Sequence, residues 1–257
     1  MTVIDPSPVT TRLAVFTDFD GTLVEIAETP DAIEVPEALP QQLENMARDL
    51  DSAFAVITGR QIEDIDRYLS PLLLPVAGAH GTQRRRADGT QEEVEESVIL
   101  AAEEIASAIR PLVAEHPELV LETKEGSVAL HYRQAPELED VCRHYMEEAV
   151  NAIPDFILMP GKMVLEARPR AVSKGEALRA FMREEPFAGR IPVFIGDDVT
   201  DEDAFIAAQE LGGVGIKLGA GETAARLRIA DVAAARALLR GLADLAIHNR
   251  GDEATEH

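Results

Sequence analysis

Two pairs of carboxylates follow short apolar segments of this 257-residue chain. Asp18 and Asp20 come directly after Leu13–Thr17. Asp197 and Asp198 follow Ile191–Ile195 after a single residue, Gly196. In such a pair, one carboxylate can act as a nucleophile while a second carboxyl group gives and takes protons. Two ionised carboxylates repel each other, so we expect a cation between them.

The first pair has two other interpretations. An EF-hand calcium loop needs an oxygen ligand such as Asp or Asn at its fifth position and Glu at its twelfth. Counted from Asp18, both positions hold threonine, which argues against a calcium loop. A plain Asp-Gly turn after the strand remains open.

Five acidic residues lie within the seven positions from Asp197 to Asp203. An acidic cap at a helix N-terminus explains the residues from Asp201 to Asp203. It does not explain Asp197 and Asp198, which follow an apolar strand. Because oxygen-only ligands favour Mg²⁺, which also binds substrate phosphate, we expect a Mg²⁺ site here.

Three further signals are weak when taken singly. Thr58 precedes Gly59 and Arg60, and Lys174 opens a helical segment. Thr58 could be only a helix cap and Lys174 only a solvated residue. Beside the carboxylates, however, they could donate hydrogen bonds and positive charge to a phosphoryl group. His80, in Gly78–Gly81, is either structural or a substrate contact.

Short apolar strands alternating with helices must position these residues. This pattern predicts a three-layer α/β domain with a parallel sheet, in which ligands bind at the carboxyl ends of the strands. The predicted strands are Leu13–Thr17, Ala53–Ile57, Leu73–Ala77, Ile191–Ile195 and Gly213–Lys217. The predicted helices are Pro36–Leu50, Ile62–Leu69, Lys174–Glu184, Glu202–Leu211 and Ala233–Ile247.

Residues 83–168 have a different pattern, which predicts an antiparallel α+β module inserted into a core of residues 1–82 and 169–257. A hairpin signal at Ala87–Thr90 opens the module. Alternation in the later strands gathers polar side chains on one sheet face, which could cover the site or be an ordinary solvated face. These residues are Glu122, Lys124, His131, Arg133, Glu166 and Arg168.

Composition narrows the function classes. The formal net charge of −23 disfavours nucleic acid and anionic membranes as partners. The single cysteine, Cys142, excludes an intrachain disulfide and suits a core thiol. No apolar run approaches a membrane span, and Met1–Thr11 has no signal-peptide pattern. We therefore expect a soluble, cytoplasmic, acidic protein.

Taken together, the motifs resemble those of haloacid dehalogenase (HAD) superfamily phosphatases. The core motifs are Asp18-x-Asp20-Gly-Thr-Leu, Thr58-Gly-Arg, Lys174-Gly and Gly196-Asp-Asp-x-Thr-Asp201. Within that superfamily the chain resembles the trehalose-6-phosphate phosphatases. That likeness rests on Gly78-Ala-His-Gly81, Glu122-Thr-Lys124, His131-Tyr-Arg133, and Gly161-Lys162 followed by Glu166-x-Arg168-Pro.

The resemblance implies a Rossmann-like core with an inserted type 2 (C2B-like) cap, and a role for each motif residue. Asp18 would attack phosphorus, and Asp20 would act as acid and then base. Thr58 and Lys174 would neutralise the phosphoryl oxygens. Mg²⁺ would be held by Asp18, Asp20 and Asp197, with Asp198 and Asp201 in an outer layer. The substrate-binding residues would be Gly59, Arg60, His80, Glu122, Lys124, His131, Arg133 and Glu166.

The expected partner is a small-molecule sugar phosphate, and a monomer is the expected assembly. Two alternatives stay open at this point. The chain could be a phosphatase for another sugar phosphate, such as sucrose 6-phosphate or a glycosyl-3-phosphoglycerate. It could also be an inactive phosphate-sensing domain, although Asp18, Asp20, Lys174 and Asp197 are all present.

Overall fold

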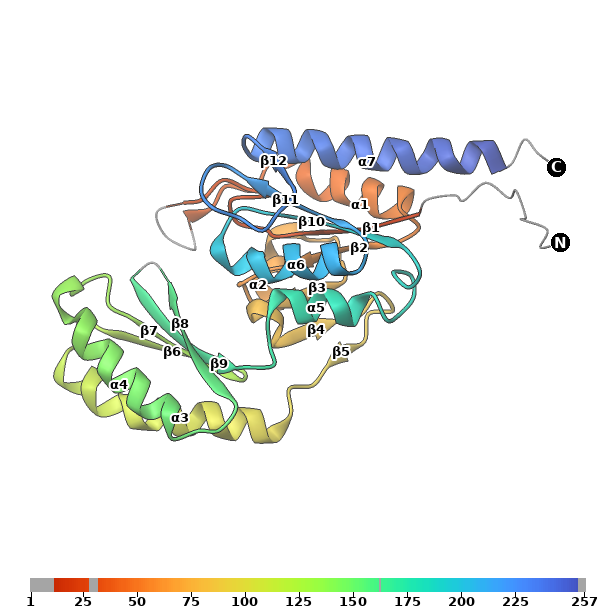
Figure 1. The fold of residues 1–257 in the computed structure, drawn as a ribbon. Helices are drawn as coiled ribbons and strands as arrows, with labels where there is room; N and C mark the ends of the chain where they lie inside the picture. The colour runs from red at the N-terminus through yellow and green to blue at the C-terminus, as the bar shows by residue number, and fades with distance from the viewer. Residues whose placement is uncertain (1–11, 28–31, 162, 254–257) are drawn as a thin grey trace.

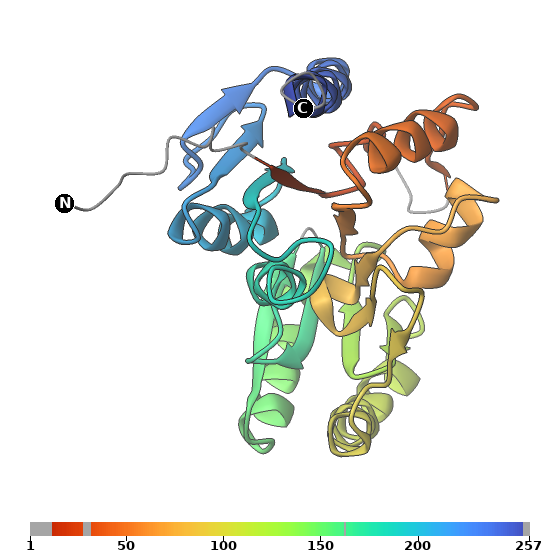
Figure 2. The ribbon, with the colours of Figure 1, turned by 90° about the vertical axis from the view of Figure 1, so that its right-hand side faces the viewer.

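The structure is a computed structural model that describes residues 12–27, 32–161 and 163–253, with side chains described as far as residue 246 (Figure 1). Met1–Thr11 and Lys162, which the sequence analysis mentioned, lie outside the described residues. Figure 2 shows the two parts of the molecule, a core that carries both termini and a cap below it. Among the described helices, none is long and apolar enough to cross a membrane.

An eight-stranded sheet forms the centre of the core in the part of the chain described. Its order is β12-β11-β10-β1-β2-β3-β4-β5, and the six strands from β12 to β3 are parallel. The strands are β1 (Leu13–Thr17), β2 (Phe54–Ile57), β3 (Val76–Gly78), β4 (Gln83–Arg85), β5 (Gln91–Glu92), β10 (Ile191–Gly196), β11 (Val214–Leu218) and β12 (Leu227–Ile229).

Helices cover both faces of this sheet, as the apolar strands require. On one face lie α1 (Leu39–Asp49), α2 (Ile62–Leu69) and α7 (Val232–Glu253), and on the other α5 (Lys174–Phe181) and α6 (Glu202–Glu210). Val15 belongs to the first apolar cluster and its neighbour Phe16 to the second. Successive side chains of a strand point to opposite faces, so both faces are buried. The expected three-layer α/β core is confirmed.

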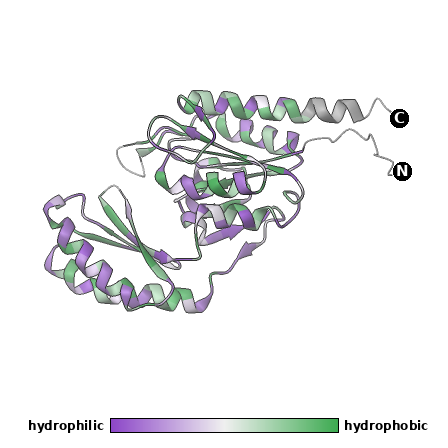
Figure 3. Cartoon of the chain, in the orientation of Figure 1, coloured by the Kyte–Doolittle hydropathy of each residue, from purple (hydrophilic) through white to green (hydrophobic). Residues whose placement is uncertain are grey.

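The cap is a four-stranded antiparallel sheet with two helices on one face. Its strand order is β6-β7-β9-β8, and its helices lie on the side away from the core (Figure 1). In Figure 3 these helices alternate between hydrophilic and hydrophobic residues, consistent with one buried face each. The elements are α3 (Glu96–Glu115), β6 (Val120–Lys124), β7 (Ser127–His131), α4 (Glu139–Asn151), β8 (Phe156–Gly161) and β9 (Val164–Pro169).

The register of the cap sheet confirms the predicted division of its faces. Ala129 pairs with Glu122 on one side and with Glu166 on the other, so these residues share a face. Leu130 pairs in the same way with Leu121 and Leu165, and its side chain lies in the apolar cluster beneath the helices. The polar face is therefore the one without helices.

The hairpin expected at the start of the inserted module is built differently. We predicted that it belongs to the insert, but β4 pairs antiparallel with β3 and extends the core sheet. Arg84 explains how a charged strand fits there, because its guanidinium lies 5.1 Å from the Phe181 ring centroid and also pairs with Glu92 and Glu184. The short strand β12 had no counterpart in the prediction.

Candidate active site

A cavity of about 500 Å³ opens at the carboxyl ends of β1, β2 and β10, between the core and the cap. In this sheet, β1 lies between β2 and β10, so the strand order changes direction at β1. Open α/β sheets bind ligands at such a position. Of the residues singled out from the sequence, those lining the cavity are Asp18, Asp20, Thr58, Gly59, Arg60, His80, Glu122, Lys124, His131, Arg133, Lys174, Asp197 and Asp198.

A buried lysine joins the two carboxylate motifs. Lys174, the first residue of α5, is 2% exposed. Its Nζ lies 2.7 Å from Asp201 Oδ1 and 3.0 Å from Asp18 Oδ1. Burial alone would lower the pKa of Lys174, but the Asp18 and Asp201 carboxylates raise it well above its usual range. Lys174 therefore carries a full positive charge beside Asp18.

Asp201 organises the turn after β10. Its side chain is fully buried, and its Oδ2 accepts hydrogen bonds of 2.9 Å from the amides of Asp197 and Asp198. Its Oδ1 accepts from Lys174. Both oxygens of Asp201 are thus engaged by protein donors, while exposed Asp198 caps the 3₁₀ turn Val199–Asp201. These bonds hold the turn and Lys174 together.

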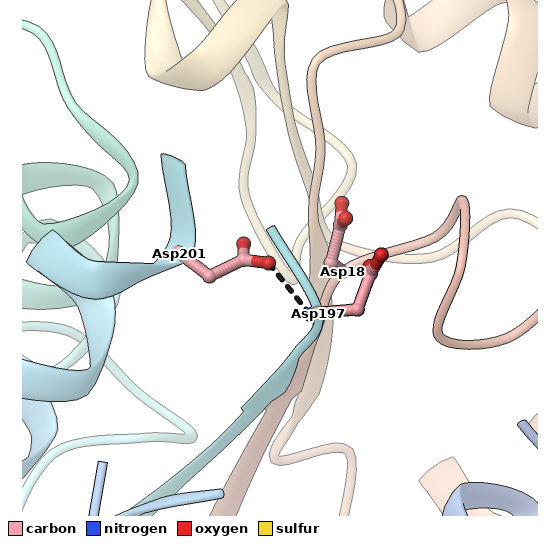
Figure 4. Close-up of side chains that lie close together, drawn as sticks. All are labelled: Asp18, Asp197 and Asp201. Atoms are coloured by element: carbon pink, nitrogen blue, oxygen red, sulfur yellow. Dashed lines mark hydrogen bonds between the residues drawn. The ribbon is translucent and has the colours of Figure 1, made fainter. Parts of the chain in front are cut away.

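The carboxylates of Asp18, Asp197 and Asp201 could hold a metal ion, since an oxygen of each lies within 4.8 Å of the others. Figure 4 shows Asp18 and Asp197 pointing in the same direction, whereas Asp201 reaches the main chain of Asp197. The close approach of Asp197 to the first motif requires glycine at position 21. The φ of Gly21 is +71°, and a Cβ there would meet Asp197 Oδ2 at 2.2 Å.

Two of these carboxyl groups, those of Asp18 and Asp197, have raised pKa values. Burial raises the pKa of Asp18 well above its usual value, against the opposing pull of Lys174. Burial and then Asp201 raise the pKa of Asp197 to about 6, although a hydrogen bond of 3.1 Å from Thr22 opposes this. A hard divalent cation would keep both groups ionised, so the donor set fits Mg²⁺.

Arg60 contacts the second carboxylate of the first motif. Its Nε and Nη2 each donate to one oxygen of Asp20 at 2.7 Å, which is a bidentate pair. The guanidinium also lies 5.1 Å from the centroid of the Tyr68 ring. The sequence analysis placed Arg60 among the substrate contacts, and nothing in the sequence between Asp20 and Arg60 indicates this pair. The pair fixes the direction of Asp20.

His80 and Glu166 join the core to the cap. His80 packs against Gly59, where a Cβ would meet its ring at 2.7 Å, and its Nε2 lies 3.5 Å from Glu166 Oε2. Burial and the nearby cation Lys174 lower the pKa of His80 well below its usual value, so the ring is neutral at neutral pH. Glu166 also accepts from Ser127 at 3.3 Å. Glu166 therefore lies beside the cavity, outside its lining.

The cap side of the cavity carries a second polar group. His131 Nε2 lies 2.9 Å from Glu122 Oε2, and Lys124 Nζ lies 3.8 Å from Glu122 Oε1. The hydrogen bond with His131 lowers the pKa of Glu122, which keeps this half-exposed carboxylate ionised. On the core side, Gln61 and Asp64 also line the cavity. The sequence analysis missed these two because it attached no motif to the start of α2.

Comparison with known proteins agrees with the sequence motifs. The profile of a family described as trehalose-phosphatase matches residues 16–234. A trehalose-6-phosphate phosphatase of Escherichia coli strain K12 is 42% identical over 221 residues, which are 86% of this chain and 83% of that protein. A probable trehalose-phosphate phosphatase of Sinorhizobium fredii is 39% identical over 237 residues, 92% of this chain and 88% of that one.

The fold has a similar solved counterpart. The crystal structure of a trehalose-6-phosphate phosphatase related protein superposes with a TM-score of 0.75 and is 29% identical. The match covers 92% of this chain and 99% of that chain. Core and cap are therefore both shared with a known protein.

The Lys174 bridge generates a stability prediction. Lys174→Met should lower the free energy of unfolding by about 3–5 kcal/mol at pH 8, because it leaves buried carboxylates without their cation. Without Lys174, which lowers the pKa of Asp18, this pKa rises further above its value in the unfolded state. The folded state binds more protons, so the penalty should shrink as the pH falls to 5. Urea denaturation at both pH values measures this.

A surface ion pair supplies the control. Arg110 is 53% exposed and pairs with Glu103, so Arg110→Met should cost less than about 1 kcal/mol at either pH. Equal stability of Lys174→Met and the wild-type protein at pH 8 would contradict the assignment of Lys174 as the buried counter-ion.

Proposed function

The chain belongs to the trehalose-phosphatase family, a family of phosphoric monoester hydrolases, and we propose that it hydrolyses trehalose 6-phosphate to trehalose and inorganic phosphate. The observation that carries this proposal is the composition of the 500 Å³ cavity. Its core wall holds two carboxylate pairs and a buried lysine, a set suited to phosphoryl chemistry. Its cap wall holds Glu122, Lys124, His131 and Arg133, a set suited to sugar hydroxyls.

The first step forms a covalent intermediate on Asp18. A carboxylate oxygen of Asp18 attacks phosphorus, the bond from phosphorus to the sugar oxygen breaks, and Asp20 gives that oxygen a proton. Lys174 and the Thr58 hydroxyl neutralise the phosphoryl oxygens, which carry the charge in the transition state. Lys174 is suited to this role because its ammonium already lies 3.0 Å from Asp18.

The second step releases phosphate. Asp20, now a carboxylate, accepts a proton from a water molecule that attacks phosphorus, and the bond between phosphorus and Asp18 breaks. The bidentate contact with Arg60 holds the Asp20 carboxyl group in a fixed direction for both proton transfers. Arg60 thus supports catalysis through Asp20 in our proposal, in addition to any contact with substrate.

We further propose that Mg²⁺ is the cofactor. Asp18, Asp197 and the main-chain carbonyl of Asp20 would hold it, with Asp198 and Asp201 outside them. When bound, the ion supplies positive charge that orients the phosphate and offsets the charge of the two carboxylates. The proposal is supported by the grouping of the Asp18 and Asp197 carboxylates, whose pKa values burial raises and which a cation would keep ionised.

A substrate panel tests the function. Phosphate release should be much faster from trehalose 6-phosphate than from glucose 6-phosphate or sucrose 6-phosphate. Sugar binding drives the cap onto the core, so recognition of the disaccharide should appear in kcat/KM. Equal rates on all three would contradict the substrate assignment. A preference for sucrose 6-phosphate would assign that compound as the substrate instead.

Substitutions on the cap separate sugar recognition from phosphoryl chemistry. Glu122→Ala should lower kcat/KM for trehalose 6-phosphate by roughly 5- to 150-fold, as expected when a partner hydroxyl is left unpaired. The same variant should hydrolyse p-nitrophenyl phosphate, which has no sugar, at nearly the wild-type rate. Loss on both substrates would mean that Glu122 supports the core chemistry.

Metal removal tests the cofactor. Protein treated with EDTA should lose activity and regain it with Mg²⁺. Because the pKa of Asp197 is about 6, protons compete with the cation below neutrality. The rise in Tm produced by Mg²⁺ should therefore be larger at pH 7.5 than at pH 5.5. Full activity in excess EDTA would exclude this role for the metal.

Asparagine substitutions separate the two carboxyl groups of the first motif. Asp18→Asn should lower kcat by at least ~10⁴, because the nucleophile is lost. Asp20→Asn should be less damaging on p-nitrophenyl phosphate than on the sugar phosphate, since p-nitrophenolate leaves without a proton. Mass spectrometry of quenched Asp20→Asn should detect phosphate on Asp18. Turnover by Asp18→Asn above a few per cent of wild type would rule out the covalent route.

A further inference from the structure

The use of lysine in this chain is unusual. Of its 24 basic residues, 20 are arginine and only four are lysine. Arginine and lysine differ in shape, since the ammonium is a compact point charge and the guanidinium a broad fork. The few positions that hold lysine in this arginine-rich chain are therefore candidates for a role that a compact charge fills better. These are Lys124, Lys162, Lys174 and Lys217.

The proposed function explains two of the four. Lys124 and Lys174 line the cavity, and Lys162 lies outside the described residues. Lys217 is 5% exposed and is absent from the cavity lining. It lies near the end of β11, directly opposite Gly196 of β10, which precedes Asp197. A buried ammonium thus lies behind the turn that carries a proposed cation ligand.

The hydrogen bond made by Lys217 is informative. Burial of an ammonium is unfavourable unless it is paired, and the carboxylate of Glu202 is near enough to pair with it. Yet Glu202 Oε1 is 3.9 Å from Nζ and has no hydrogen-bond partner among the described residues. Nζ instead donates to the main-chain carbonyl of Asp197 at 2.7 Å.

The hydrogen bond from Lys217 is one of two that fix the same peptide group. The carbonyl of Asp197 and the amide of Asp198 belong to the same peptide unit, which is planar. Lys217 holds its oxygen at 2.7 Å, and Asp201 Oδ2 accepts from its N–H at 2.9 Å. With that peptide fixed, the backbone direction from which the Asp197 side chain starts is fixed too. The Thr22 hydroxyl then holds the carboxylate itself.

We propose that Lys217 is a positioning residue for Asp197, which it directs towards Asp18 by binding the Asp197 carbonyl. The inference rests on the proposed function to the extent that Asp197 is a cation ligand. Groups that orient a ligand from behind typically change metal affinity by about 10- to 100-fold when they are removed. A compact ammonium fits this role, since a guanidinium has a broader, planar head.

Removal of the Lys217 charge has two effects of opposite sign on the affinity for Mg²⁺, so the sign of the measured change distinguishes them. Loss of a nearby positive charge would by itself strengthen binding of Mg²⁺. Loss of the anchor would weaken it, because Asp197 would have to be ordered when the cation binds. If Lys217 positions Asp197, the second effect exceeds the first. The sign of the change in affinity therefore identifies the role.

The experiment measures Mg²⁺ affinity by calorimetry and by the Mg²⁺-dependent rise in Tm, without substrate. Lys217→Met, which keeps the length of the side chain, should weaken binding by about 10-fold or more. The matched control is Arg85→Met. Arg85 is another buried cation that binds a main-chain carbonyl, that of Leu74, and it lies outside the cavity lining. The Arg85→Met variant should have a lower Tm and an unchanged affinity for Mg²⁺.

A second variant guards against misfolding. Lys217→Arg keeps the charge in the interior and should still bind Mg²⁺ more weakly than wild type. Wild-type affinity in Lys217→Arg, or unchanged or tighter binding in Lys217→Met, would overturn the inference while leaving the proposed function intact. Failure of the wild-type protein itself to bind Mg²⁺ would overturn both.

Discussion

The bridge from Lys174 to Asp18 and Asp201 is the contact on which the rest of the site depends. It requires that one buried ammonium lie between carboxylates from two different strand ends. Adjacent parallel strands β1 and β10 meet this requirement, and the amide of Asp18 also donates to the carbonyl of Ile195. Helix α5 must begin close to α6, and Gly175 permits this because a Cβ there would meet the Asp203 carbonyl oxygen at 2.5 Å. This cation offsets part of the negative charge of the acidic turn.

The two carboxyl groups of the first motif are held by different cations, which separates their roles. Asp18 is almost fully buried beside the compact ammonium of Lys174, whereas Asp20 is one-third exposed in the fork of Arg60. An ammonium leaves room beside Asp18, where our proposal places the phosphoryl group. A bidentate guanidinium fixes the plane of the Asp20 carboxylate. The carboxyl group to which we assign the proton transfers is thus the more exposed of the two.

Much of this arrangement could be predicted from the sequence, because local patterns encode it. Strand β1 and helix α2 occupy the predicted residues, and the two-residue alternation assigned Glu122 and Glu166 to one face. The contacts between distant elements could not be predicted. Nothing in the local pattern distinguishes a hairpin that continues the core sheet from one that opens the insert, since the choice depends on where Arg84 finds its carboxylate partners. The same holds for the pair of Arg60 with Asp20 and for the contact of Lys217 with Asp197.

The cap completes the site without competing for the phosphate. Its polar face pairs Glu122 with His131 and Lys124, so acceptors and donors for hydroxyl groups alternate there with little local excess of charge. On the core wall, positive charge comes from Lys174 and, in our proposal, from Mg²⁺. A phosphorylated sugar would therefore be oriented by charge at one end and by hydrogen bonds at the other. Glu166 links these two regions, because it lies on the polar face of the cap and contacts core His80, whose ring is neutral. This contact connects the cap to the core beside the cavity, and in our proposal Glu166 also belongs to the residues that recognise the sugar.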